Sequence, residues 1–339
     1  METGARELRI VVGTIVIVAT IHALTPAGPH SWHWLHTFAA KLYYLPILLS
    51  ARSFGLRGAM VSALAVSGLT LFHVIRDWAG LPMVQAEEAA EIATFWLVGL
   101  VSAVLFRRER EAREATRLAH EETLTALAGS LELRERYTAG HSRRVRDYAL
   151  FVAHEMGLRD QAFLASLAQG ALLHDVGKIG IPDRILLKPG PLGQEERAVM
   201  RRHPEMGASL VGDIASLRTA RDLILAHHER YDGAGYPRGL AGAAIPLAAR
   251  IFTVADAFDA LTTDRPYHDA LSWEEAASKV ADGRGSQFDP AAADAFLRIP
   301  FNTWARVAAA TGVTLRRCAS NGSHPPEPIV RVEGWEVEP

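Results

Sequence analysis

The chain contains almost no cysteine, since Cys318 is the one thiol among 339 residues. A single thiol excludes an internal disulfide framework and a cysteine-rich zinc site. The chain also lacks a strong net charge, because 36 lysines and arginines nearly balance 38 aspartates and glutamates. This balance argues against a general nucleic-acid binder, and we expect no DNA partner.

Charged residues are scarce before residue 107, where four apolar stretches lie at about residues 10–24, 34–50, 58–75 and 92–106. A helix that spans a bilayer needs about 20 residues, and four such stretches are difficult to bury in a short soluble domain. A cleaved signal peptide would explain only the first stretch. We therefore predict a transmembrane sensor region of four helices at residues 1–106, with the lipid bilayer as its partner.

Arginines are distributed unevenly among the loops of this region. Two precede the first stretch, two lie between the second and third, and three follow the fourth, whereas the other loops contain at most one basic residue. Basic loops face the cytoplasm. The pattern predicts a multi-pass protein of the cell (inner) membrane whose two termini are cytoplasmic.

Five histidines of this region should lie near the outer face of the membrane: His22, His30, His33, His36 and His73. They could form a pH-sensing or metal-sensing cluster. They could equally be interfacial polar residues beside Trp32 and Trp34, as is common at the headgroup level. The second interpretation is favoured, because histidine alone is weak evidence for a sensor.

Residues 107–136 are rich in arginine and glutamate and contain no proline. Leu124, Leu127 and Leu131 follow a three-to-four-residue spacing, which predicts a stalk helix that forms a homodimer and transmits a signal from the membrane. A plain charged linker helix is the alternative. Residues 137–310 are typical of a soluble globular domain, and residues 311–339 form a polar C-terminal extension. The predicted fold class is all-α.

Polar residues interrupt apolar, helix-like runs throughout residues 137–310. The motifs place His174 and Asp175 in LLHDVGK, His203 in RRHPEMG, His227 and His228 in AHHERYDGAGYP, and Asp256 in VADAFDALTTDRPY. Each residue alone has an ordinary explanation, as a surface group, a buried partner or a helix cap. Together they are the ligand types of zinc, iron and manganese sites, and inward projection from several helices would gather them.

Six ligands exceed what one metal needs, so we predict two divalent metals with Asp175 as the bridging carboxylate. Lys178 should lie one helical turn beyond His174, where its ammonium group would meet a substrate phosphate. A solvated lysine is the alternative for Lys178. Asp175 and Lys178 are the predicted catalytic residues.

Three sequence blocks carry a family resemblance: HDVGKIGIPDRILLKPGPL, HHERYDGAGYPRGLAGAAIPLAARIFTVADAFDALTTDRPY and GSQFDP. They resemble the HD-GYP domain, a subgroup of the HD metal-dependent phosphohydrolases, over about residues 124–297. The resemblance implies a helical bundle that binds two or three metals, usually iron or manganese. It also implies hydrolysis of the second messenger cyclic di-GMP to linear pGpG, and on to GMP.

The resemblance assigns roles to individual residues. It implies that the metal ligands are His174, Asp175, His203, His227, His228 and Asp256. Lys178 and Arg265 would hold the substrate phosphates, and Tyr236 would line the substrate cleft. The loop from Asp232 to Gly239 would also meet a partner protein.

Two positions depart from the family pattern. Tyr137 stands where members with a third metal have a glutamate, so we expect a two-metal site with His141 as an accessory ligand. His268 stands where arginine or lysine usually follows RPY, which would weaken phosphate binding at neutral pH. The favoured function is a membrane-anchored cyclic di-GMP phosphodiesterase in signal transduction. The alternatives are a catalytically weak module that binds cyclic di-GMP or a protein, and an HD phosphohydrolase that acts on another nucleotide.

Overall fold

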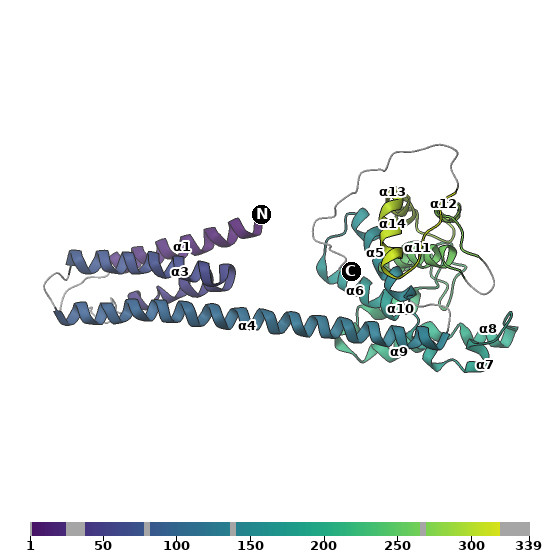
Figure 1. The fold of residues 1–339 in the computed structure, drawn as a ribbon, viewed down its shortest axis with the longest axis horizontal. Helices are drawn as coiled ribbons and strands as arrows, with labels where there is room; N and C mark the ends of the chain where they lie inside the picture. The colour runs from purple at the N-terminus through teal and green to yellow at the C-terminus, as the bar shows by residue number, and fades with distance from the viewer. Residues whose placement is uncertain (1, 25–37, 78–81, 136–139, 265–268, 319–339) are drawn as a thin grey trace. The chain divides into compact units, whose positions relative to one another are not determined.

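The structure is a computed structural model that describes residues 2–24, 38–77, 82–135, 140–264 and 269–318. Within these residues the regular elements are helices, accompanied by two isolated β-bridges (Figure 1). The all-α prediction is therefore confirmed. The chain forms two compact units, Met1–Ala119 and His120–Pro339. The finer division predicted at residues 106, 136 and 310 stays a prediction.

The first unit contains α1 (Glu2–Leu24), α3 (Tyr44–Asp77) and the first part of α4 (Pro82–Glu135). Gly55 breaks the helical path of α3 with a φ of 64° and a ψ of −148°. Ile47 before this break and Val66 after it enter one buried cluster with Val18 and Phe95. Both halves of α3 therefore contribute to one buried cluster.

Three helical segments are long and apolar enough to cross a membrane: Gly4–Leu24, Phe38–Ile75 and Ala86–Glu135. The second and third predicted spans largely fall in one of these segments, on either side of the break at Gly55. The fourth predicted span and the predicted stalk are likewise parts of one helix, α4. The count of four spans stays a prediction.

Polar groups gather among these apolar helices. His22 and His73 are buried, and their ring centroids lie 4.7 Å apart. His30, His33 and His36 lie outside the described residues. The structure thus brings two of the five histidines together, and both interpretations of the cluster stay open.

The second unit begins with the last turns of α4 and continues through short helices. They are α5 (His141–Glu155), α6 (Gln161–Leu173), η1 (Val176–Gly180), α7 (Asp183–Leu186), α8 (Gln194–Met200), α9 (His203–Gly212), η2 (Ala215–Leu217), α10 (Ala220–Ala226), η3 (Gly242–Ala244), α11 (Leu247–Thr262), α12 (Trp273–Asp282), α13 (Pro290–Arg298) and α14 (Phe301–Ala310). Several begin at side-chain caps. Asp160 accepts a hydrogen bond from the N–H of Phe163 at the start of α6, and Ser272 forms a capping box with Glu275 at the start of α12.

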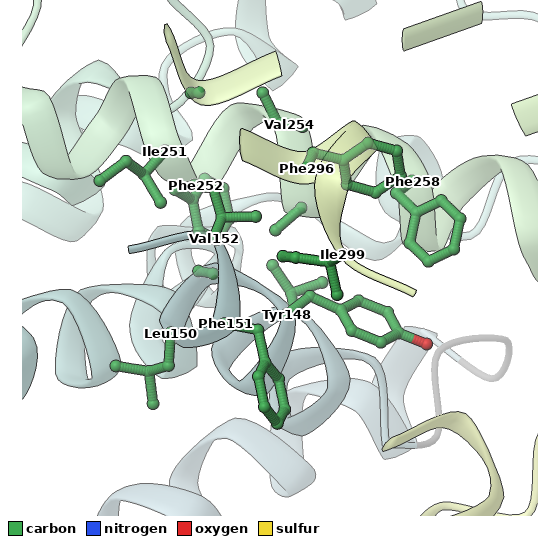
Figure 2. Close-up of a cluster of buried hydrophobic side chains, with 14 of the residues drawn as sticks. Tyr148, Leu150, Phe151, Val152, Ile251, Phe252, Val254, Phe258, Phe296 and Ile299 are labelled. Atoms are coloured by element: carbon green, nitrogen blue, oxygen red, sulfur yellow. The ribbon is translucent and has the colours of Figure 1, made fainter. Parts of the chain in front are cut away.

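The main core lies between α5, α6, α11, α12, α13 and α14. Figure 2 shows side chains of this core from α5, α11 and α13. The ring of Phe258 lies 5.2 Å from that of Tyr148, 5.0 Å from that of Phe296 and 5.2 Å from that of Trp304, measured between centroids. Aromatic residues bury large apolar areas, so this cluster fixes α11 against α5. That pairing matters because both helices carry metal-site residues.

Leu124 of the predicted dimer seam belongs to a smaller core. It is buried beside Leu172 and Leu173 of its own chain, whereas Leu127 is exposed. A symmetric seam through all three leucines would need Leu124 to leave this core. The homodimer through residues 107–136 stays a prediction.

Candidate metal centre

The predicted ligands lie mostly at helix ends. His141 is the first residue of α5, His203 is the first residue of α9, and His174 directly follows α6. His227 and His228 follow α10, while Asp256 lies within α11. Helix ends allow each short segment to turn its polar groups inward without breaking the apolar face of the helix.

Two groups of ligand atoms form, each within 4.8 Å. The first, called site 1 below, consists of Asp175, His203, His227 and His228. The second, called site 2, consists of His141, His174 and Asp256. All six predicted ligands and the accessory residue His141 are thus brought together. His141 is more important as a candidate ligand than the sequence indicated, because it is one of three in site 2.

Asp175, a member of site 1, also faces site 2. Its Oδ1 is 3.2 Å from His203 Nε2 of site 1, and its Oδ2 is 3.1 Å from His174 Nε2 of site 2. A carboxylate with one oxygen toward each cluster has the placement that a bridging ligand requires. This geometry agrees with the bridging role predicted from the sequence.

The Nδ1 atoms of the histidines are engaged away from the sites. In His174, His203 and His227, Nδ1 lies 2.7–2.8 Å from the carbonyl oxygen three residues earlier. Such a bond places the proton on Nδ1 and leaves the lone pair of Nε2 available to bind a metal, which is the usual arrangement of metal-binding histidines. The residues therefore fit divalent metal ions.

His141 is oriented by a carboxylate instead. Its Nδ1 lies 2.8 Å from Oδ2 of Asp259, which is buried and also accepts two hydrogen bonds from Arg144, at 2.6 and 3.1 Å. Sequence reasoning missed both Asp259 and Arg144. Asp259 follows Asp256 by three residues and so shares its helix face, but only the tertiary structure reveals the partner in α5.

The charges within the centre shift several pKa values. Burial alone would lower the pKa of His174, but the adjacent Asp175 carboxylate outweighs it and raises the pKa to about 9. Burial lowers the pKa of His228 to about 4, and the charge on His203 acts in the same direction. Burial and the charge on His228 hold the pKa of His227 well below its usual range. Neutral imidazoles, as metals require, are therefore favoured at His227 and His228 at neutral pH.

Lys178 is placed differently from the prediction. The α-helix ends at Leu173, and residues 176–180 form a 3₁₀ turn, so Lys178 contacts Asp175 and not His174. Its Nζ lies 2.7 Å from Asp175 Oδ2 and 3.0 Å from Glu135 Oε1. Burial would lower the pKa of Lys178, but the two carboxylates raise it, which keeps the ammonium group charged.

Gly177 allows this turn to approach α9. A Cβ atom at Gly177 would lie 1.9 Å from the carbonyl oxygen of His203 and 2.4 Å from the amide nitrogen of Gly207. Only glycine fits at this contact. The glycine of the HDVGK motif therefore holds the segment that follows Asp175 against the helix that begins at His203.

A cleft of about 740 Å³ opens beside both sites and is lined by His228 of site 1, Asp256 of site 2, Tyr236 and Arg201. The ring of Tyr236 stacks on that of His228 at 4.7 Å, and the guanidinium of Arg201 lies 5.1 Å from the Tyr236 centroid. Tyr236 thus lines the cleft, as predicted, while sequence reasoning missed Arg201.

Three residues discussed from the sequence lie outside the described residues: Tyr137, Arg265 and His268. Their predicted effects on the third metal and on phosphate binding stay predictions.

The helical domain brings seven histidine and aspartate side chains into two adjoining clusters. This arrangement is typical of helical proteins that bind metal ions. Residues 126–292 match the HD domain family, and this part of the chain is an HD domain. This match confirms the prediction of an HD domain.

Curated relatives share this part of the chain. A cyclic di-GMP phosphodiesterase response regulator of Xanthomonas campestris is 45% identical over 179 residues, which cover 52% of this chain and 47% of the relative. A cyclic di-GMP phosphodiesterase of Thermotoga maritima is 41% identical over 180 residues, covering 52% and 49%. A 3'3'-cGAMP-specific phosphodiesterase of Vibrio cholerae is 39% identical over 167 residues, covering 48% and 32%. The chain spans about half the length of the first two relatives and a third of the last.

Proposed function

We propose that the chain is a metal-dependent phosphodiesterase that hydrolyses cyclic di-GMP to linear pGpG, and on to GMP. The observation that supports this proposal most is the position of Asp175, whose two oxygens face two separate groups of ligand atoms. Relatives named cyclic di-GMP phosphodiesterases support the choice of substrate.

The proposed ligands are His174, Asp175, His203, His227, His228 and Asp256, joined by His141. Their mixture of imidazole and carboxylate suits iron or manganese. Two such cations, when bound, acidify a water molecule and offset the negative charge of a phosphoryl group.

The chain supplies the remaining chemistry. Lys178 holds a permanent positive charge beside Asp175, where it would bind an oxygen of the scissile phosphate and stabilise charge that develops there. Tyr236, held by stacking on His228, would contact a base or ribose in the cleft. Arg201 at the cleft rim would bind the second phosphate, and Arg265 is proposed for phosphate binding on its motif.

The long apolar helices support a further proposal, that residues before 107 anchor the enzyme in the cell membrane with the HD domain in the cytoplasm. The distribution of arginines supports this orientation. A homodimer through the stalk and a partner protein at the loop from Asp232 to Gly239 belong to the same proposal.

The relative named for 3'3'-cGAMP favours a second candidate substrate. The test is a comparison of cyclic di-GMP and 3'3'-cGAMP with the full chain in detergent, loaded anaerobically with Mn²⁺ or Fe²⁺ and followed by chromatography of products. We expect pGpG and then GMP from cyclic di-GMP, and loss of both products with Asp175→Ala. Preferential hydrolysis of 3'3'-cGAMP would select the second candidate, and tight binding without product would indicate a binding module.

A further inference from the structure

The C-terminal end of α4 contacts residues next to the metal centre through three charged side chains, Glu132, Arg134 and Glu135. Each of them reaches a different backbone segment or side chain of the HD domain. None of the three belongs to the set of predicted ligands. Their contacts indicate what the end of this helix does for the site.

Glu132 caps the helix that begins with a ligand of site 2. Its Oε2 accepts a hydrogen bond from the N–H of Gly140 and its Oε1 from the N–H of Ser142, both at 2.7 Å. Gly140, the N-cap residue of α5, has no side chain of its own to offer. The first N–H groups of a helix need such acceptors, so a carboxylate from α4 fixes the backbone on both sides of His141.

Glu135 holds the lysine of the HD motif. Its Oε1 lies 3.0 Å from Lys178 Nζ, which also contacts Asp175. The side chains of Glu135 and Lys178 are 12% and 19% exposed, so water screens this pair only in part. The carboxylate of Glu135 therefore determines where the ammonium group rests relative to Asp175.

Arg134 binds the backbone that follows Lys178. Its guanidinium donates to the carbonyl oxygens of Lys178 at 3.0 Å and Ile181 at 2.7 Å, and it forms an ion pair with Asp183 at 2.6 Å. The planar, multidentate guanidinium joins the 3₁₀ turn to the end of α4 in one orientation.

We propose that Glu132 and Glu135 are positioning residues, through which the end of α4 sets the geometry of site 2 and of Lys178. Since α4 is one helix from Pro82 to Glu135, a shift or rotation of this helix would move His141 and Lys178 together. A movement of this end of α4 would then change metal binding at site 2 and phosphate binding at Lys178 simultaneously. The part that concerns Lys178 rests on the proposed function, and the part that concerns site 2 does not.

The first experiment measures metal binding and needs no substrate. Glu132→Gln preserves the shape of the side chain, but its amide nitrogen cannot accept the second backbone hydrogen bond. Mn²⁺ is titrated into the metal-free full chain in detergent, with detection by electron paramagnetic resonance. We expect one of the two bound ions to bind about 10- to 100-fold more weakly, as when an outer-shell partner is lost, while the other keeps its affinity.

Glu122→Gln is the matched control, because Glu122 lies on the same helix and is exposed. It should leave both affinities unchanged. Mn²⁺ affinities of Glu132→Gln equal to those of the wild type would overturn the proposal. Equal weakening of both bound ions would also overturn it, because that result would indicate a general loss of folding and not an effect on site 2.

The second experiment separates Glu135 from the metals. Glu135→Gln should keep two bound ions and lower kcat/KM for cyclic di-GMP about 10- to 100-fold, because Lys178 loses its fixed position. An unchanged kcat/KM, or the loss of a metal ion, would contradict the role given to Glu135. If the wild type does not hydrolyse cyclic di-GMP, the proposed function fails, while the metal titration of Glu132→Gln still decides the role of α4.

Discussion

Asp259 balances the charge of Arg144 inside the HD domain and orients His141 at the same time. Arg144 and Asp259 are each 1% exposed, and the carboxylate accepts two hydrogen bonds from the guanidinium. Asp259→Asn keeps the size of the side chain but removes its charge and one of its two acceptor oxygens. The substitution leaves a buried guanidinium without a compensating charge.

The expected loss is large because neither charge can reach water. Removal of one partner of a buried ion pair destabilises a protein by about 3–5 kcal/mol. The chain offers a control with the same fork geometry, since Arg284 contacts Asp294 at 2.7 and 2.8 Å, but those side chains are 49% and 42% exposed. Asp294→Asn should cost only about 0.2–1 kcal/mol, as is typical of exposed pairs.

The assay is hydrogen exchange of the amides in α5 and α11, measured for the metal-free full chain in detergent at increasing urea concentration. The urea dependence gives the free energy of unfolding of this region for each variant. Equal effects of Asp259→Asn and Asp294→Asn would refute the reasoning, since burial would then make no difference. A second consequence is weaker metal binding at site 2, because His141 loses the group that orients it.

Three further predictions test other parts of the centre. Gly177→Ala should force η1 away from α9, because the new Cβ would meet the His203 carbonyl oxygen at 1.9 Å. We expect a free energy of unfolding in urea about 1–3 kcal/mol lower, together with weaker metal binding at site 1. Wild-type values of both quantities would contradict this prediction. Arg201→Ala should raise KM for cyclic di-GMP several-fold in steady-state kinetics and leave kcat nearly unchanged, because the proposed contact is uniform binding; a fall in kcat alone would be inconsistent with that role. Metal affinity at site 2 should rise between pH 7 and pH 9, by up to about tenfold per pH unit. The pKa of His174 is raised to about 9, so a proton must leave this residue before the metal binds. Mn²⁺ titrations at three pH values test this, and an affinity that does not change with pH would show that it is wrong.

The predicted ligands could be found from the sequence because each one lies on or beside an apolar run within a short motif. Site 1 shows this most clearly, since His203, His227 and His228 lie at helix ends and need only the local turn to face inward. The adjacency of His174 and Asp175 likewise indicated a shared carboxylate. The roles of Tyr236 and Arg265 were assigned from the family motifs.

The supporting residues could not be predicted, because their roles depend on distant packing. Asp259 contacts His141 across 118 positions of the sequence, and Arg134 reaches Ile181 across 47. A charged residue near a helix end is ordinary in any sequence, so nothing marks Arg134 as a contact of the site. The 3₁₀ turn after Asp175 was missed for a similar reason, since its geometry follows from the close approach of Gly177 to α9.

The central claim is that Asp175 joins two metal sites in one centre. Elemental analysis of the anaerobically purified full chain, in the wild type and in Asp175→Ala, tests it most directly. We expect two divalent ions per chain in the wild type and fewer than two in the variant, because site 1 and site 2 share this carboxylate. A folded wild type that holds a single ion per chain, or an Asp175→Ala variant that still holds two, would contradict it.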